Sequence, residues 1–274
     1  MENNLLKSDN ITSKLVDDTF YISINSSNEE NYSILTLKDI PSENIEITCN
    51  EYVKVKILIN EFENKNVKFI LKNNAFLKLN FLACGNYLFD LEESSNAFVA
   101  MADLVKGNVD FNATFNLLGD NANSEWHLAS LGADNDKKVF NINFNHVAKN
   151  TTGVMSNYGV VEDESMMHFK GVSHIKNGSI KSKTHQSAKI MVFDPKCHAK
   201  ANPILKIDES DIEASHAAIV GKVNDEHMFY LCSRGISEND AKQLITLGYL
   251  KPITNYFEDQ KYVQEIVDGI EKRL

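Results

Sequence analysis

Short segments of alternating apolar and polar residues follow one another along most of the chain. Examples of these segments are residues 45–49, 53–59 and 139–147. Turns rich in Asn, Asp, Gly and Ser separate one segment from the next. This period of two is typical of β-strands with one buried face. The series runs on without an inserted helical segment and without a visible repeat of fixed length. It favours a solenoid over a closed sandwich or barrel, because each coil of a solenoid needs only its neighbours to cover it.

The apolar period changes near the end of the chain. We expect strand-like alternation to continue through Phe229 and Leu231. Ser237 and Asp240 then have the spacing of a capping box, the motif that stabilises the first turn of a helix, with Ser237 as the N-cap. A three- and four-residue apolar stripe follows, and Gly248 is expected to end this helix.

A second helix is predicted over residues 262–274, where apolar residues recur at three- and four-residue steps. Its stripe packs on the first helix or on the β body, or is partly reserved for a partner. We therefore divide the chain into a polar lead-in over residues 1–30, a β body over residues 31–232 and a helical segment over residues 233–274.

Composition narrows the class of protein. The chain has 274 residues, 43% of them hydrophobic, and a formal net charge of −10. Such a charge argues against nucleic acid or an anionic membrane as a partner. The first residues lack the layout of a signal peptide, and no apolar run is long enough to span a membrane. The four cysteines are far apart and without CxxC spacing, so we expect a cytoplasmic protein with reduced thiols.

An ordered set of motifs lies between residues 203 and 236. The motifs are Pro203, Leu205 and Ile207, then Ser215-His216-Ala217-Ala218-Ile219, then Met228-Phe229-Tyr230-Leu231, and finally Ser233-Arg234-Gly235-Ile236. In order and spacing this set resembles the C-terminal core of the SufB/SufD family of iron–sulfur cluster assembly scaffold proteins, and is most similar to its SufD branch. The likeness covers roughly the last half of the chain.

The resemblance implies an all-β fold, a right-handed parallel β-helix followed by a small C-terminal helical segment. It also implies a non-catalytic scaffold subunit that pairs with a SufB-like subunit and binds a SufC-type ABC ATPase. The sequence contains no Walker glycine loop, so ATP hydrolysis would belong to the partner. The residues implied in partner binding are Arg234, Gly235, Leu244 and Ile245.

Two residues are candidates for contact with a nascent iron–sulfur cluster shared with the partner subunit. His216 has small neighbours, and neutral imidazole is a good ligand for iron; a histidine at this place in SufD-type chains is thought to help hold the cluster. Cys197 could supply a thiolate. The alternatives are a hydrogen-bonded structural histidine and a turn cysteine with no ligand duty. Cys232 is expected to pack in the interior.

Two departures from the SufB pattern favour the SufD role. Ala188 stands where SufB-type chains have a cluster cysteine, and Ala217 stands where they have an acidic residue. A SufB-like homodimeric scaffold in a minimal system remains an alternative, as does a β-helical carbohydrate-active protein. Flavin binding is left open.

Overall fold

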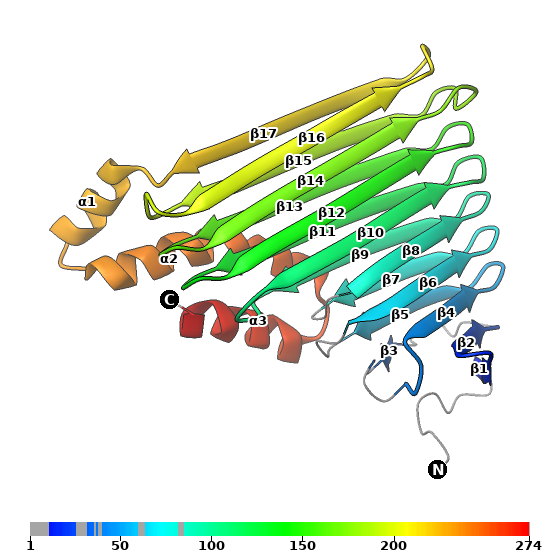
Figure 1. The fold of residues 1–274 in the computed structure, drawn as a ribbon, viewed down its shortest axis with the longest axis horizontal. Helices are drawn as coiled ribbons and strands as arrows, with labels where there is room; N and C mark the ends of the chain where they lie inside the picture. The colour runs from blue at the N-terminus through cyan, green and yellow to red at the C-terminus, as the bar shows by residue number, and fades with distance from the viewer. Residues whose placement is uncertain are drawn as a thin grey trace.

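The chain folds into two parallel β-sheets that lie face to face, with helices on one side (Figure 1). The computed structural model describes residues 11–25, 32–35, 37, 40–59, 64–81 and 85–273. The chain passes from one sheet to the other and back, and each passage places a new strand beside the one a coil earlier. This is the predicted parallel β-helix.

The nine-stranded sheet contains β1 and the even-numbered strands. In spatial order these are β1 (Ile11–Val16), β2 (Thr19–Ile24), β4 (Asn44–Cys49), β6 (Lys65–Leu71), β8 (Gly85–Leu91), β10 (Val109–Leu117), β12 (Lys137–His146), β14 (Met166–Ile175) and β16 (His198–Ile207). β1 and β2 form an antiparallel hairpin, and the remaining pairings in this sheet are parallel. Part of the expected lead-in over residues 1–30 is therefore regular structure.

The eight-stranded sheet contains the other odd-numbered strands. These are β3 (Tyr32–Leu35), β5 (Lys54–Ile59), β7 (Phe76–Phe81), β9 (Asn96–Asp103), β11 (Asn123–Gly132), β13 (Thr152–Val161), β15 (Lys183–Val192) and β17 (Glu213–Lys222). All of their pairings are parallel.

The coils lengthen along the chain, which explains why no fixed repeat is visible in the sequence. Asn66 and Asn86, which hydrogen-bond across neighbouring coils, are 20 residues apart, whereas Thr151 and Ser182 are 31 apart. The strands grow accordingly, from 6 residues in β4 to 10 in β17. The solenoid therefore widens toward its C-terminal end (Figure 1).

Aromatic side chains stack through the interior because parallel register repeats a position from coil to coil. Phe69, Phe89, Phe115 and Phe144 are register partners, with successive ring centroids 5.1, 4.4 and 4.9 Å apart. Such pairs contribute about 0.5–1.5 kcal/mol each beyond the burial of their surface. Trp126 is fully buried beside them, and its indole N–H donates to Asn157 Oδ1 at 2.8 Å.

Asparagines form a ladder on the outer face of the nine-stranded sheet. Each side-chain amide donates to the Oδ1 of the asparagine one coil earlier, at 2.9–3.1 Å; the members are Asn44, Asn66, Asn86, Asn112 and Asn141. Asparagines in strands thus stabilise the stacking of the coils through these hydrogen bonds, in addition to the asparagines found in turns.

The helical segment folds back on the outer face of the eight-stranded sheet. It comprises α1 (Asp225–Ser233), α2 (Glu238–Leu250), the 3₁₀-helix η2 (Lys251–Tyr256) and α3 (Gln260–Arg273). Small residues of the sheet, such as Ala100 and Ala129, let the helices approach closely. The predicted stripe of α3 is confirmed, and Tyr262 and Ile270 bury it against the sheet. No helix in the described part of the chain is long and apolar enough to cross a membrane.

The expected strand at Phe229 and Leu231 is wrong, because these residues belong to α1. The side chain of Asn224 accepts a hydrogen bond from the Glu226 N–H at 2.8 Å and caps this helix, and Asp225 and Glu226 place acidic groups in its first turn. Both features stabilise a helix start. The helices therefore begin before the expected boundary at residue 233.

Two further expectations in this region are wrong. Cys232 lies exposed on α1 instead of packing inside. Gly248 does not end α2, which continues to Leu250 and runs directly into η2. The capping of α2 is confirmed: Ser237 Oγ accepts a hydrogen bond from the Asp240 N–H at 3.1 Å.

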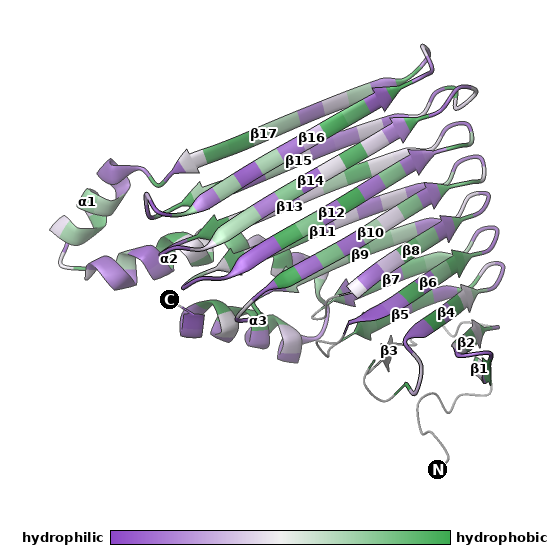
Figure 2. Ribbon diagram, in the orientation of Figure 1, coloured by the Kyte–Doolittle hydropathy of each residue, from purple (hydrophilic) through white to green (hydrophobic). Residues whose placement is uncertain are grey.

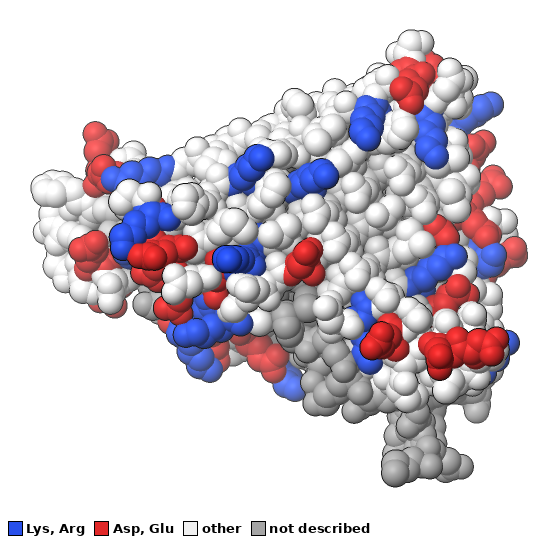
Figure 3. All heavy atoms as spheres, in the orientation of Figure 1, with Lys and Arg blue, Asp and Glu red and all other residues white. Residues whose placement is uncertain are grey.

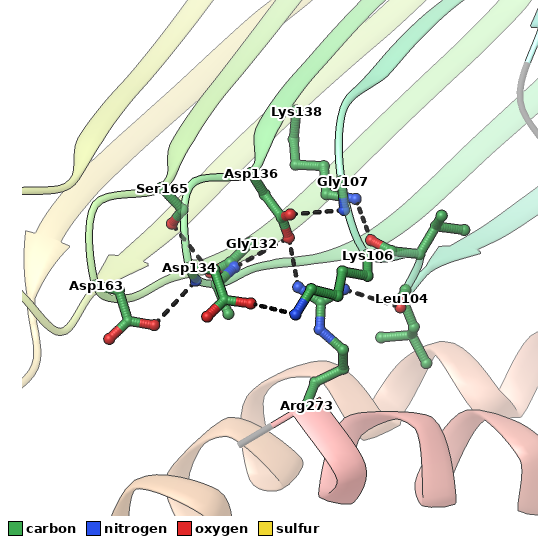
Figure 4. Close-up of polar contacts among 12 residues, drawn as sticks. Leu104, Lys106, Gly107, Gly132, Asp134, Asp136, Lys138, Asp163, Ser165 and Arg273 are labelled. Atoms are coloured by element: carbon green, nitrogen blue, oxygen red, sulfur yellow. Dashed lines mark hydrogen bonds and ion pairs between the residues drawn. The ribbon is translucent and has the colours of Figure 1, made fainter.

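A polar network joins the end of α3 to the solenoid (Figure 4). Arg273 donates to a carboxylate oxygen of Asp136 and to the Leu104 carbonyl, while the other oxygen of Asp136 accepts from the Gly107 N–H at 2.6 Å. Asp136 is 3% exposed. A charged pair so well hydrogen-bonded fixes the last helix to the turns between strands.

A second charged pair lies inside the solenoid. Lys138 Nζ is 3.3 Å from Asp103 Oδ1, both side chains are fully buried, and Ser130 Oγ donates to Asp103 Oδ2 at 2.6 Å. Burial raises the pKa of the Asp103 carboxyl, while the Lys138 ammonium and the Ser130 hydroxyl oppose that rise. The buried, ionised form of Asp103 is thus stabilised by the Lys138 ammonium.

Replacing Lys138 by methionine is expected to lower the free energy of unfolding by about 3–5 kcal/mol, because it leaves the Asp103 carboxylate buried without its partner. Urea unfolding followed by circular dichroism measures this. The exposed neighbour Lys137 provides the control variant Lys137→Met. Equal stability of the two variants would contradict the assignment.

Candidate scaffold interface at the open end of the solenoid

The C-terminal end of the solenoid exposes two strand edges. β16 and β17 are the last strands of their sheets, and no described strand pairs with their outer sides. Every residue of β17 is exposed, including the apolar Ile219 (56%) and Val220 (46%). Figure 2 shows the hydrophobic run in the second half of β17, and Figure 3 shows an uncharged stretch along the upper edge of the molecule, with Lys and Arg side chains spaced out on the surface below it. An apolar edge strand of this length is a template for pairing with another chain.

The direction of the free N–H groups follows from the ladder. Glu213 N donates to Ser182 O, and Val223 N donates to Val192 O. In a parallel ladder alternate residues face alternate neighbours, so the odd-numbered residues of β17 bond to β15. The N–H groups of the even-numbered residues, including His216, Ala218 and Val220, therefore point to the open edge.

The β16 edge differs because it contains a proline. His198 N donates to Ser165 O, and Asp208 N donates to Ile175 O, so the odd-numbered residues of β16 face outward. Pro203 occupies the middle of this outward row and has no N–H to offer. β17 is thus the continuous pairing edge, and β16 is interrupted.

His216 lies in β17, as expected, at a position that faces the lumen. Its register partner is Gln186, and the partners in the coils below are Met155 and Trp126, all of them buried. Because strand positions one coil apart share a face, His216 completes this inward column at the open end. The imidazole is exposed there, where a second molecule could reach it.

Gln186 supports the position below His216. Its Nε2 donates to Ser173 Oγ at 2.7 Å and to the Ile204 carbonyl at 3.1 Å, which ties the two sheets together beneath the opening. Sequence analysis did not identify this link. Ser173 and Gln186 belong to different sheets, and their contact depends on how the two sheets face each other inside the solenoid.

Cys197 lies away from His216. It occupies the turn before β16, on the side of the solenoid where β17 ends at Lys222. His216 lies six residues before Lys222 along β17, so roughly 20 Å separate Cys197 from His216. Burial raises the pKa of the Cys197 thiol, and its Sγ is 3.6 Å from the Asp163 carbonyl. A protonated thiol is a poorer ligand than a thiolate. No group of three potential ligands occurs among the described residues.

The four residues expected to bind a partner lie on or beside α1 and α2. Leu244 is 51% exposed, whereas Ile245 packs partly against the core beneath the helices. Gly235 adopts φ 88° and ends α1, a conformation that favours glycine. The Arg234 guanidinium lies 5.0 Å from the Tyr230 ring.

An aromatic residue of α1 was missed because it was assigned to a strand. Phe229 is 75% exposed, and no residue of α1 is buried. The N-cap at Asn224 was the sequence signal that would have revealed the helix. Phe229, Tyr230 and Leu244 are thus exposed large apolar or aromatic side chains of the α1–α2 segment.

Comparison with known proteins bears on the whole β body. A family model described as "SUF system FeS cluster assembly, SufBD core domain" matches residues 40–249. This match begins well before the last half of the chain, where the motif resemblance is strongest. It covers the strands from β4 to β17, the helix α1 and nearly all of α2.

Individual relatives agree with the family match. The iron–sulfur cluster assembly protein SufD of Bacillus subtilis is 32% identical over 161 residues, which are 59% of this chain and 37% of that protein. SufD of Escherichia coli is 30% identical over 115 residues, 42% of this chain and 27% of the relative. SufB of Bacillus subtilis is 28% identical over 109 residues, which are 40% of this chain and 23% of that protein. The matched region is thus a minor part of each relative. On the family match, this chain belongs to the SufBD core family of iron–sulfur cluster assembly proteins.

Proposed function

We propose that this chain is a SufD-like, non-catalytic scaffold subunit of a Suf-type iron–sulfur cluster assembly complex. The observation that carries the proposal is the free β17 edge. All ten of its residues are exposed, its even-numbered residues point their N–H groups outward, and its second half carries the apolar Ile219 and Val220. In the isolated chain this edge is an aggregation hazard, so a protein that retains it needs a partner to cover it.

The partner that fits this edge is a second scaffold subunit with a similar open end. A strand of such a subunit would add to the eight-stranded sheet through main-chain hydrogen bonds, and Ile219 and Val220 would be buried at the junction. Pro203 directs the pairing to β17 and leaves β16 as a flanking surface. A SufB-like subunit is the candidate suggested by the family.

His216 would contribute one imidazole at this junction. The described part of the chain holds no group of three potential ligands at His216, so the partner subunit would supply the other ligands of an iron–sulfur cluster. The cluster is the cargo of assembly. Cys197 packs partly against the core in a turn, and its distance from His216 supports a structural role for it outside this junction.

Two alanines support the SufD role over the SufB role. Ala188, where SufB-type chains carry a cysteine, is 6% exposed and faces the lumen in the same column as Ala218. Ala217, on β17, offers no acidic group beside His216. This side of a shared site therefore presents His216 without the cysteine and the acidic residue of SufB-type chains.

A SufC-type ATPase would bind the exposed side of α1 and α2. The α3 stripe is already buried against the sheet, so the apolar surface that remains for a partner is carried by Phe229, Tyr230 and Leu244. ATP hydrolysis would reside in that ATPase.

Co-expression with the SufB- and SufC-type proteins of the same genome tests the proposed function. We expect a complex that contains all three chains on size-exclusion chromatography, with ATP hydrolysis only when the SufC-type protein is present. A stable homodimer that excludes the SufB-type chain, or ATP hydrolysis lost on mutation of this chain, would overturn the proposal.

Replacing Leu244 by aspartate is expected to weaken ATPase capture by at least about tenfold, because a charge would replace an exposed apolar side chain of the proposed binding surface. Surface plasmon resonance with the immobilised chain measures this. Leu118→Asp is the matched control, since Leu118 is 46% exposed and lies on a turn remote from the helices. Unchanged capture by the Leu244 variant would move the contact elsewhere. Ile245 is less suitable because its substitution would also disturb packing.

A further inference from the structure

A cleft lies between the outer face of the eight-stranded sheet and the segment formed by α2 and η2. Its volume is about 180 Å³, below the roughly 300–1,000 Å³ of pockets that enclose drug-sized ligands. It therefore suits a single ring or two fused rings. The residues that define its chemistry are His127, Ser156, Tyr158, Tyr249, Asn255 and Tyr256.

Two pairs of aromatic rings form its walls. The His127 and Tyr256 rings stack with centroids 4.0 Å apart and an interplanar angle of 19°. Tyr158 and Tyr249 meet edge to face at 5.6 Å. Flat walls of this kind favour a planar ring, which can stack on one pair and contact the edges of the other.

The cleft carries no net charge at neutral pH. Burial lowers the pKa of the His127 imidazole, despite the opposing Glu125 carboxylate, and burial raises the pKa of the Tyr249 phenol to about 12. No Lys or Arg lines the cleft among the residues that the structure describes. Lys189 Nζ lies 5.3 Å from the centre of the Tyr158 ring, and Glu125 Oε2 lies 3.2 Å from His127 Nε2, so the charges beside the walls are of opposite sign. A charged ligand would thus lose its hydration with little net compensation.

The cleft nevertheless offers polar groups to the edge of a ligand. The hydroxyls of Ser156, Tyr158 and Tyr249 and the amide of Asn255 make no hydrogen bond to described residues. An asparagine amide can donate and accept at once, which matches the edge of a nucleobase. We propose that this cleft binds an uncharged heteroaromatic base, a planar ring system with hydrogen-bond donors and acceptors along its edge. The proposal does not depend on the scaffold function.

Titration of the full chain with adenosine, followed by ligand-observed NMR, tests the proposal. We expect saturable binding with a Kd below about 1 mM, and none with ribose alone. Ser156→Leu fills the cleft, and Tyr158→Leu removes one aromatic wall. Each should weaken binding by at least about tenfold.

Ser187→Leu is the matched control. Ser187 is the register partner of Ser156 on the next strand, on the same face of the sheet but outside the cleft, so this variant should bind adenosine like the original chain. Thermal unfolding shows that each variant is folded; if Tyr158→Leu does not fold, Ser156→Leu decides. Absence of saturable binding, or equal binding by Ser156→Leu and Ser187→Leu, would overturn the proposal.

Discussion

Replacing Ala218 by proline should weaken pairing with the second scaffold subunit about 100-fold while leaving the solenoid folded. The N–H of Ala218 points to the open edge, so proline removes no hydrogen bond to β15. The ring would remove a donor from the partner's ladder and occupy the space of the partner backbone. We expect the Kd of the scaffold pair to rise by about two orders of magnitude, or about 2.8 kcal/mol.

Sedimentation velocity of mixtures of the two scaffold chains measures this effect. Ala218→Val is the control, because valine retains the N–H and favours strands. The far-ultraviolet circular dichroism of both variants should match that of the original chain. A proline variant that pairs as tightly as the valine variant would show that the partner binds another surface.

The second large effect is expected at His216. Replacing His216 by alanine should reduce the iron–sulfur cluster content of the reconstituted complex sharply, because it removes the imidazole at the shared site. Since the side chain is exposed at the open end, the free energy of unfolding should change by only about 1 kcal/mol. Iron and sulfide content, together with visible absorbance, measure cluster loading.

Two control variants separate a ligand role from a general disturbance. His185→Ala removes another exposed histidine, one strand away on the outer face, where its Nδ1 meets Ser215 Oγ at 2.7 Å. Cys197→Ser tests the turn cysteine, and its effect should be weaker than that of His216→Ala. A His216→Ala complex that assembles and loads cluster normally would leave this chain as an architectural partner alone.

Much of the fold follows from local patterns. Period-two alternation predicts the strands because one face of each is buried, and the absence of inserted helices favours coils over a closed barrel. The α3 helix follows from its apolar stripe. The place of His216 on a strand could be predicted in the same way.

Other features depend on contacts between coils that no local pattern encodes. The aromatic run of α1 is compatible with a strand, and only its N-cap decides for a helix. The roughly 20 Å between Cys197 and His216 depends on how β16 and β17 fold back on each other. The lumen-facing direction of His216 depends on its register with Gln186. The proline in the β16 edge becomes informative only once the register fixes which N–H groups point outward.

Backbone hydrogen exchange at β17 tests the proposed interface most directly. In the isolated chain, the N–H groups of Ala218 and Val220 should exchange rapidly, whereas those of Ala217 and Ile219 should be protected by β15. In the complex with the second scaffold subunit, Ala218 and Val220 should become protected by at least about 100-fold, and this alternation should disappear. An alternation that persists in a fully assembled complex would contradict pairing through the β17 edge.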